Sequence, residues 1–181
     1  MIIKTNLKDI ENNFKAINNR ITNVPDLMKK VSIIMKASVM RNFQNEGTDK
    51  EKWKPLSLMT KARRRKGKGK GTAKILQDTG YLKNSIFPIV YENKAMLVTN
   101  TAYAPTHQFG AKKGEFGVIN AVIKAHKRRN KRGRKTILVR QHTRKVNAPF
   151  GDIPARPFMV LREEDKKRII DLVKGYIYGK E

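Results

Sequence analysis

The stretch IFPIVYENKAMLVT, residues 86–99, decides the fold class of this chain. Two runs rich in β-branched and aromatic residues, 86–91 and 96–99, flank the polar tripeptide Glu92-Asn93-Lys94. Such residues fit the pleated surface of a strand, and a short polar segment between two such runs is typical of a hairpin turn. The stretch therefore predicts an antiparallel β-hairpin.

Helical patterns precede this hairpin. The first predicted helix has five apolar residues at alternating spacings of three and four, which places them on one stripe: Leu7, Ile10, Phe14, Ile17 and Ile21. A second helical face follows, from Leu27 to Phe43. It comes after Pro25, at a position where a missing N–H is tolerated, and Gly47 is expected to end it.

A further helix is expected at the C-terminus. Glu163, Glu164 and Asp165 suit the positive end of a helix dipole, and an apolar face follows over 169–176. The proline-rich run 153–158 predicts an edge or an extended connection, and 103–109 a short helical or irregular turn. Antiparallel hairpins packed with N-terminal and C-terminal helices give an α+β fold, which we expect to form a single domain over 1–181.

Two strongly basic segments extend from this fold. The apolar period is lost over 48–74, which predicts a long exposed loop whose basic part is 61–74. A second β-prone pair, 118–123 and 136–146, joined by a basic tip, predicts a basic β-arm over 116–148. Lys61–Lys74 holds eight basic residues and Lys124–Lys145 eleven, and neither segment contains an acidic residue.

The formal charge of +26 requires an anionic partner or extensive solvation. Because the basic segments lack interleaved aromatics, they predict sequence-independent contact that weakens with salt. The contacted surface is nucleic acid or an acidic protein. An alternative function is that of a non-specific nucleic-acid-binding protein of ribosomal or chromatin type. The predicted contacts are Arg63, Arg64, Arg65, Lys66, Lys68, Lys70, Lys127, Arg128, Arg129, Lys131, Arg132 and Arg134.

The sequence offers no catalytic or cofactor motif, so we expect no enzyme and no cofactor. His107, His126 and His142 are poor candidates for metal ligands, because two of them lie among Lys and Arg, where a bound cation would be repelled. Carboxylates are scattered singly in the middle of the chain, which disfavours a metal-dependent nuclease, and no nucleophile-elbow or P-loop spacing occurs. There is no cysteine, and neither a signal peptide nor a membrane span is expected, so we predict a cytoplasmic chain with no membrane partner.

Several residues are predicted to hold the fold together. Trp53 is predicted to anchor its loop on the core, and this is favoured over a role in stacking on a ligand. Arg156, between Ala155 and Pro157, is a candidate for bidentate pairing with a carboxylate on a neighbouring subunit. The predicted structural anchors are Trp53, Leu56, Leu76, Gly80, Leu82, Phe109, Gly110 and Phe158.

Four segments in order resemble the phage virion morphogenesis family, the tail-completion proteins related to the G protein of phage Mu. They are RNFQNEGTDKEKWKPLSLMT (41–60), ILQDTGYLKNSI (75–86), AYAPTHQFG (102–110) and IPARPFMVL (153–161). The resemblance implies a single tail-completion domain that assembles into a ring, six-fold by expectation, between the head connector and the tail terminator. It thus implies a virion protein of the neck, assembled in the host cytoplasm. Its implied partners are itself, the tail terminator and the head-completion or connector proteins. Genomic DNA in the neck channel is a further candidate.

Overall fold

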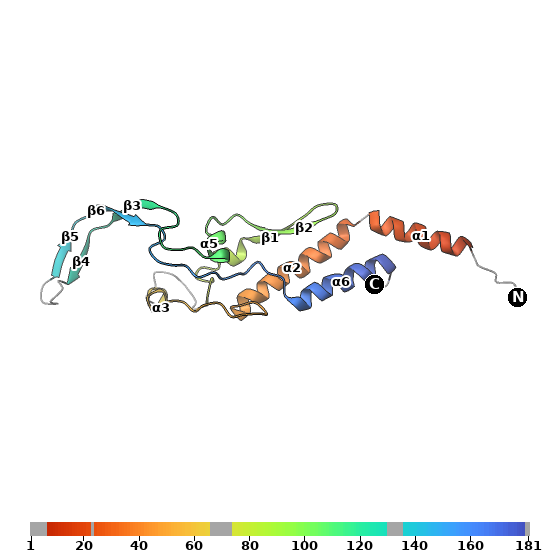
Figure 1. The fold of residues 1–181 in the computed structure, drawn as a ribbon, viewed down its shortest axis with the longest axis horizontal. Coiled ribbons are helices and arrows are strands. Elements are labelled where there is room, and N and C mark those ends of the chain that lie inside the picture. The colour runs from red at the N-terminus through yellow and green to blue at the C-terminus, as the bar shows by residue number, and fades with distance from the viewer. Residues whose placement is uncertain (1–6, 23, 66–73, 130–135, 180–181) are drawn as a thin grey trace. The chain divides into compact units, whose positions relative to one another are not determined.

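The computed structural model describes residues 7–22, 24–65, 74–129 and 136–179 and divides the chain into two compact units (Figure 1). The first, here called the body, comprises Met1–Ala104 with Arg156–Glu181. The second, here called the arm unit, comprises Pro105–Ala155. The regular elements of the described residues are helices and antiparallel hairpins, so the fold is α+β, as the sequence predicted.

Helix α2 (Pro25–Asn45) supplies much of the body's core. It begins at Pro25, with Asp26 in its first turn, and ends at Glu46, which adopts the left-handed conformation at φ 51°. The sequence predicted Gly47 as the terminator, and this was one residue late. Gly47 is needed for a different reason, because a Cβ there would lie 2.6 Å from the Glu51 carbonyl oxygen in the tight turn that follows.

The predicted hairpin is confirmed as β1 (Ile86–Val90) paired with β2 (Ala95–Thr99). The Tyr91 N–H donates to the Lys94 carbonyl at 2.8 Å and closes the turn. Both strands contact α2, and Ile86 is buried in the core. The single helical turn α4 (Tyr81–Asn84) precedes the hairpin, with Gly80 at φ 77° before it.

The core of the body joins residues that are distant in sequence. The Phe43 ring meets Trp53 edge to face at 5.7 Å between centroids and Phe158 at 5.5 Å. Aromatic pairs in such geometries add to the free energy gained from burial alone. The buried cluster comprises Val39, Phe43, Trp53, Ile75, Leu76, Leu82, Ile86, Ala104 and Phe158.

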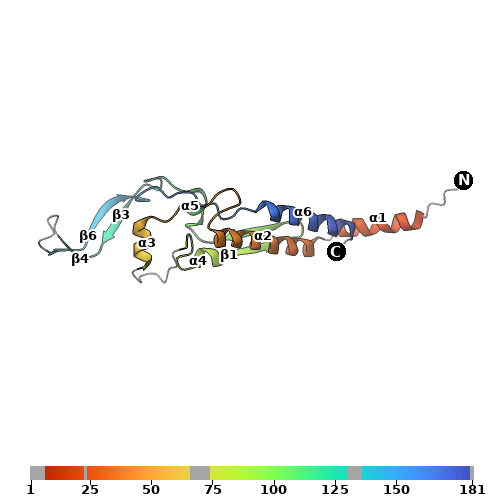
Figure 2. The ribbon, with the colours of Figure 1, turned by 90° about the horizontal axis from the view of Figure 1, so that it is seen from below.

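Helix α6 (Glu163–Tyr178) is the predicted C-terminal helix, and it packs along α2 (Figure 2). It ends at Gly179, in the left-handed conformation at φ 67°. Helix α1 (Leu7–Thr22) contacts α6 but buries none of its residues. The helix near the N-terminus that contributes to the core is therefore α2, and most of the apolar stripe of α1 is exposed.

Helix α3 (Leu58–Arg65) occupies part of the segment that the sequence predicted as loop. The Ser57 hydroxyl accepts from the Thr60 N–H at 3.2 Å and caps its start. Leu58 and Met59 are 85% and 78% exposed. The prediction of a loop was therefore wrong for 58–65. A short helix that buries little apolar surface shows no helical period of apolar residues in its sequence. Residues 66–73 of the predicted basic loop lie outside the described residues.

The arm unit starts at Pro105, inside α5 (Ala104–Phe109), the short helical turn expected there, and continues into a long hairpin. Strand β3 (Val118–Ile123) pairs with β6 (His142–Asn147), and β4 (His126–Arg129) pairs with β5 (Thr136–Val139). The predicted continuous strand 136–146 is thus interrupted at 140–141, opposite 124–125. The pairing Ile123↔His142 passes to His126↔Val139 without a shift of register, so the arm is one ribbon with a break.

Candidate interaction surfaces

The histidines do not gather into a site. His126 and His142 lie on the arm, where each ring Nδ1 is 3.0 Å from the carbonyl oxygen of the residue two positions earlier. His107 lies on α5. Among the residues that the structure describes, no three His, Asp or Glu side chains come close enough to hold a metal ion.

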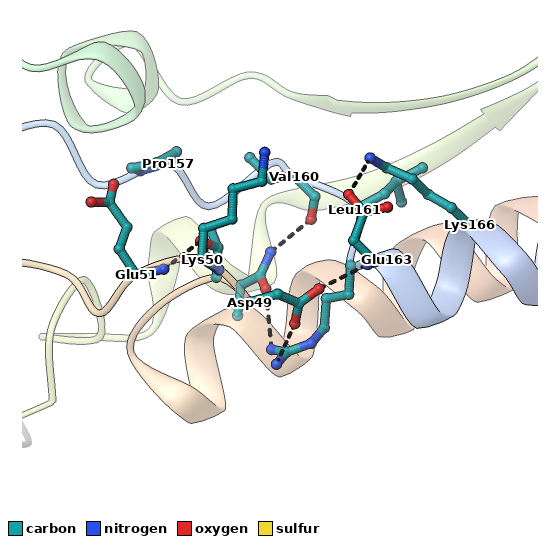
Figure 3. A pocket seen from close by; sticks show the side chains of 11 residues that line it. Asp49, Lys50, Glu51, Pro157, Val160, Leu161, Glu163 and Lys166 are labelled. Carbon is teal, nitrogen blue, oxygen red and sulfur yellow. Dashed lines mark hydrogen bonds and ion pairs between the residues drawn. The ribbon is translucent and has the colours of Figure 1, made fainter.

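A cavity of about 380 Å³ lies in the body where the turn after α2 meets the start of α6 (Figure 3). Its walls carry charges of both signs. The lining residues are Asn42, Thr48, Asp49, Lys50, Glu51, Pro157, Val160, Leu161, Arg162, Glu163 and Lys166.

Several polar groups of this cavity have partners within the chain. The Asp49 carboxylate accepts from the Glu163 N–H at 2.8 Å and from the Arg162 guanidinium at 2.7 Å. The Asn42 amide donates to the Phe158 and Val160 carbonyls at 3.1 and 2.7 Å. The arrangement fastens the turn to the first turn of α6, and it places no activated nucleophile beside a general base.

The Glu163 carboxylate shows how local these electrostatics are. Its hydrogen bond from Lys166, at 2.8 Å on the same helix, holds the pKa of Glu163 below its ordinary value. Both side chains are half exposed or more. The pair therefore contributes little to stability and marks no catalytic acid.

A buried ion pair joins α2 to α6 beside this cavity. The Asp165 carboxylate is fully buried and accepts from Arg41, while Glu164 lies 3.5 Å from the same guanidinium. Burial raises the pKa of Asp165, but hydrogen bonds from Arg41 and Ser38 oppose this, and the net pKa lies below the ordinary value. The hydrogen bond with Asp165 likewise raises the pKa of Arg41. The sequence indicated only that Asp165 suits a helix dipole, because no local pattern reveals a partner so far away.

Arg156 is buried, although it was predicted to meet a neighbouring subunit. It is 6% exposed, and its Nε donates to the Lys54 carbonyl at 3.0 Å and its second terminal nitrogen to Pro55 at 3.4 Å. Burial, with a further contribution from nearby Arg64, lowers the pKa of Arg156. The guanidinium therefore fixes the 54–55 backbone inside the body, and the prediction of an interface role was wrong for this fold.

Arg64, predicted as a polyanion contact, is also engaged within the body. Its Nε lies 3.4 Å from Asp78, and its Nη1 donates to the Lys74 carbonyl at 2.7 Å. The side chain is 13% exposed. The side chains of Arg63 and Arg65, and the predicted contacts Lys66, Lys68 and Lys70, lie outside the described residues.

The arm carries exposed positive charge. Lys127, Arg128 and Arg129 lie on β4 and are all exposed, and strand alternation points Arg128 away from its two neighbours. No carboxylate pairs with these three side chains in the described part of the chain. Lys131, Arg132 and Arg134, at the predicted tip, lie outside the described residues.

The predicted anchors fall into two groups. Trp53, Leu76, Leu82 and Phe158 are buried, and the Trp53 Nε1 donates to the Pro157 carbonyl at 3.0 Å. Leu56 packs against this core and is partly buried. Phe109 is 78% exposed, so its assignment as a core anchor was wrong. A hydrophobic residue type does not specify which side of a short helix the core covers.

Two glycines among these anchors occupy left-handed positions. Gly80 has φ 77° and Gly110 has φ 81°. A Cβ at Gly110 would lie 2.8 Å from the Ile153 carbonyl oxygen, where Ala111 and Ile153 form a backbone bridge. Both conformation and space therefore favour glycine at Gly110.

Helices in the described part of the chain are too short or too polar to span a bilayer.

Residues 5–177 match the model of the phage virion morphogenesis family. The chain is 29% identical over 150 residues to Mu-like prophage FluMu G protein 2 of Haemophilus influenzae, covering 83% of this chain and 75% of that protein. No solved structure matches the chain.

Proposed function

The chain belongs to the phage virion morphogenesis family, and on that premise we propose that it is a structural subunit of the phage neck. In this proposal it completes the tail at the head–tail joint. Copies form a ring, six-fold by expectation, between the head connector and the tail terminator. The protein works by occupying this position and not by catalysis.

The difference between the body, which has many internal contacts, and the arm, which has exposed basic residues, supports this proposal. The body is fastened internally by Arg41–Asp165, Arg156 and the Phe43–Trp53–Phe158 cluster, so it forms a rigid unit for a ring. The arm is a two-stranded ribbon with exposed basic residues. Isolated two-stranded hairpins are marginally stable in water, so such a ribbon gains most from a partner. A body that can be tiled and a separate basic contact unit suit a joint between two assemblies.

The arm, in this proposal, contacts an anionic surface of the particle. Its exposed Lys127, Arg128 and Arg129 present charge without aromatic stacking groups, which suits a phosphate backbone. DNA in the neck channel is the first surface to test, and an acidic face of an adjacent ring is the second.

Deleting the gene in its phage and imaging the particles tests the proposal. We expect mature heads and tails that fail to join, or tails with an unfinished upper end. Complementation with the wild-type chain restores joined particles, and a small label on the chain is expected at the neck. Joined, complete particles without this protein, or a label on another part of the virion, would contradict the proposal.

A further inference from the structure

Most of the apolar stripe of α1 is exposed among the residues that the structure describes. Leu7, Phe14 and Ile21 are 74%, 68% and 55% exposed, and Ile10 is 42% exposed. Their spacing of alternately three and four residues gives the narrow seam by which a helix packs along one neighbour. Within the described structure α1 contacts α6, where Arg20 donates to the Ile177 carbonyl at 3.4 Å. Of the five stripe residues only Ile17 is partly buried, and the other four stay exposed.

The β1–β2 hairpin has an outer apolar face that is partly exposed among the described residues. Side chains alternate along a strand, so Ile86 and Leu97, which pack on the core, leave the intervening residues on the opposite side. Phe87 and Tyr91 are 44% and 48% exposed on that side. The outer face comprises Phe87, Ile89, Tyr91, Met96 and Val98.

The two faces match in length and in kind. The stripe from Leu7 to Ile21 spans about 21 Å at 1.5 Å per residue. A five-residue strand spans about 17 Å. A sheet with one face on a helix and the other apolar is completed by a second helical layer. Pro88 lacks an N–H and so makes the β1 edge a poor site for strand addition, which favours docking on the face.

The two apolar faces carry little net charge, so a second copy of the chain can bind there. Two copies of a chain of net charge +26 repel each other strongly at their basic surfaces. Helix α1 carries three basic and two acidic residues, and 86–99 carries one of each. The two apolar faces are therefore among the parts of the molecule where copies can approach with little repulsion.

We propose that α1 of one copy docks its apolar stripe on the outer face of the β1–β2 hairpin of the next copy. Each copy then donates one surface and accepts at a different one, which is a heterologous contact of the kind that closes rings. This inference rests on the ring assembly of the proposed function and identifies its subunit contact.

Cysteine cross-linking tests this contact cleanly, because the chain has no cysteine of its own. One preparation carries Phe14→Cys, another carries Phe87→Cys, and a short bismaleimide is added to each alone and to their mixture. We expect a covalent dimer only in the mixture. The matched control is Asn12→Cys, on the opposite side of α1, which is expected to give no dimer with Phe87→Cys.

Three cross-linking outcomes would overturn the contact. Dimers of Phe14→Cys alone would indicate pairing of α1 with α1. A chain carrying both cysteines that cross-links only within itself would indicate that α1 folds onto its own hairpin. Absence of any product in the mixture, under conditions where native mass measurement shows that the cysteine variants assemble, would remove the contact altogether.

Native mass measurement separates this inference from the proposed function. We expect Phe14→Glu and Phe87→Glu each to weaken self-association at least about thirtyfold, as for a central aromatic contact, and Asn12→Glu to leave it unchanged. Circular dichroism checks that each variant is folded. If both Phe variants assemble like wild type, the ring stands and this contact is wrong. If wild type is monomeric at every concentration and absent from neck rings, both proposals fail.

Discussion

Arg41 on α2 and Asp165 on α6 form a buried ion pair inside the body, although 124 residues separate them in the sequence. Asp165 is fully buried, whereas Arg41 keeps 30% of its side chain exposed. Ser38 on α2 adds a further hydrogen bond to the same carboxylate. This pair fixes the C-terminal helix to α2, and the Asp49 contacts fix the start of the same helix to the turn after α2.

Replacing Arg41 by Met is expected to destabilise the body by about 3 kcal/mol, because it leaves the Asp165 carboxylate buried without its main partner. Urea denaturation followed by circular dichroism measures the loss. Lys15→Met is the matched control, since its pair with Glu11 is exposed on both sides and is worth well under about 1 kcal/mol. Equal losses in the two variants would contradict the importance of the buried pair.

Acid is expected to weaken the body through Asp165. Its pKa is lower in the folded chain than in the unfolded chain, so the unfolded state binds the proton first as pH falls. The contribution is therefore complete above the unfolded value, about 3.9, and is lost as pH drops through the folded value. Urea midpoints measured from about pH 6 downward should fall less for Asp165→Asn than for wild type. The same acid dependence in both would assign the effect to other groups, such as Glu163.

Two phenylalanines test the assignment of the core. Phe158→Ala is expected to cost about 3–5 kcal/mol because the side chain is fully buried. Phe109→Ala is expected to change stability by less than about 0.5 kcal/mol, because the ring is largely exposed. Thermal or urea unfolding compares the pair directly. A large loss from Phe109→Ala would restore its role as an anchor.

Gly110→Ala is expected to disrupt the backbone bridge between Ala111 and Ile153. Gly117→Ala is the control, since Gly117 has nearly the same φ, 79°, but nothing within 4 Å of an added Cβ. Both variants pay the left-handed strain of about 1–2 kcal/mol, and only Gly110→Ala adds the clash at 2.8 Å. Hydrogen exchange at the Ala111 and Ile153 amides should accelerate more in Gly110→Ala. Equal protection of these amides in the two variants would show that the backbone around Ile153 shifts enough to accommodate the added Cβ.

Replacing Lys127, Arg128 and Arg129 together by Ser tests the arm as a DNA contact. If each of the three meets a phosphate, the slope of log affinity against log salt should become shallower by about 2.7 for duplex DNA. The control replaces three exposed lysines of the body, Lys36, Lys167 and Lys174, by Ser and keeps the total charge change the same. An unchanged slope in the arm variant would direct the search to an acidic protein surface.

The sequence by itself determined the kinds of element and their order. The two β-prone runs around a polar tripeptide within 86–99, and the helical periods before and after, predict a hairpin between helices without knowledge of any long-range contact. These signals are local, because strand and helix periods are properties of neighbouring residues. The four ordered segments likewise indicated the family before any fold was known.

Only the tertiary structure decided which side chains those elements bury. Arg156, expected at an interface, is buried because backbone carbonyls accept its hydrogen bonds. Phe109, expected in the core, is exposed because no layer of the described structure covers it. Helix α3 gave no periodic signal because it packs little apolar surface, and the partner of Asp165 lies 124 residues away. Burial depends on neighbours that the chain brings together only on folding, so no local pattern contains it.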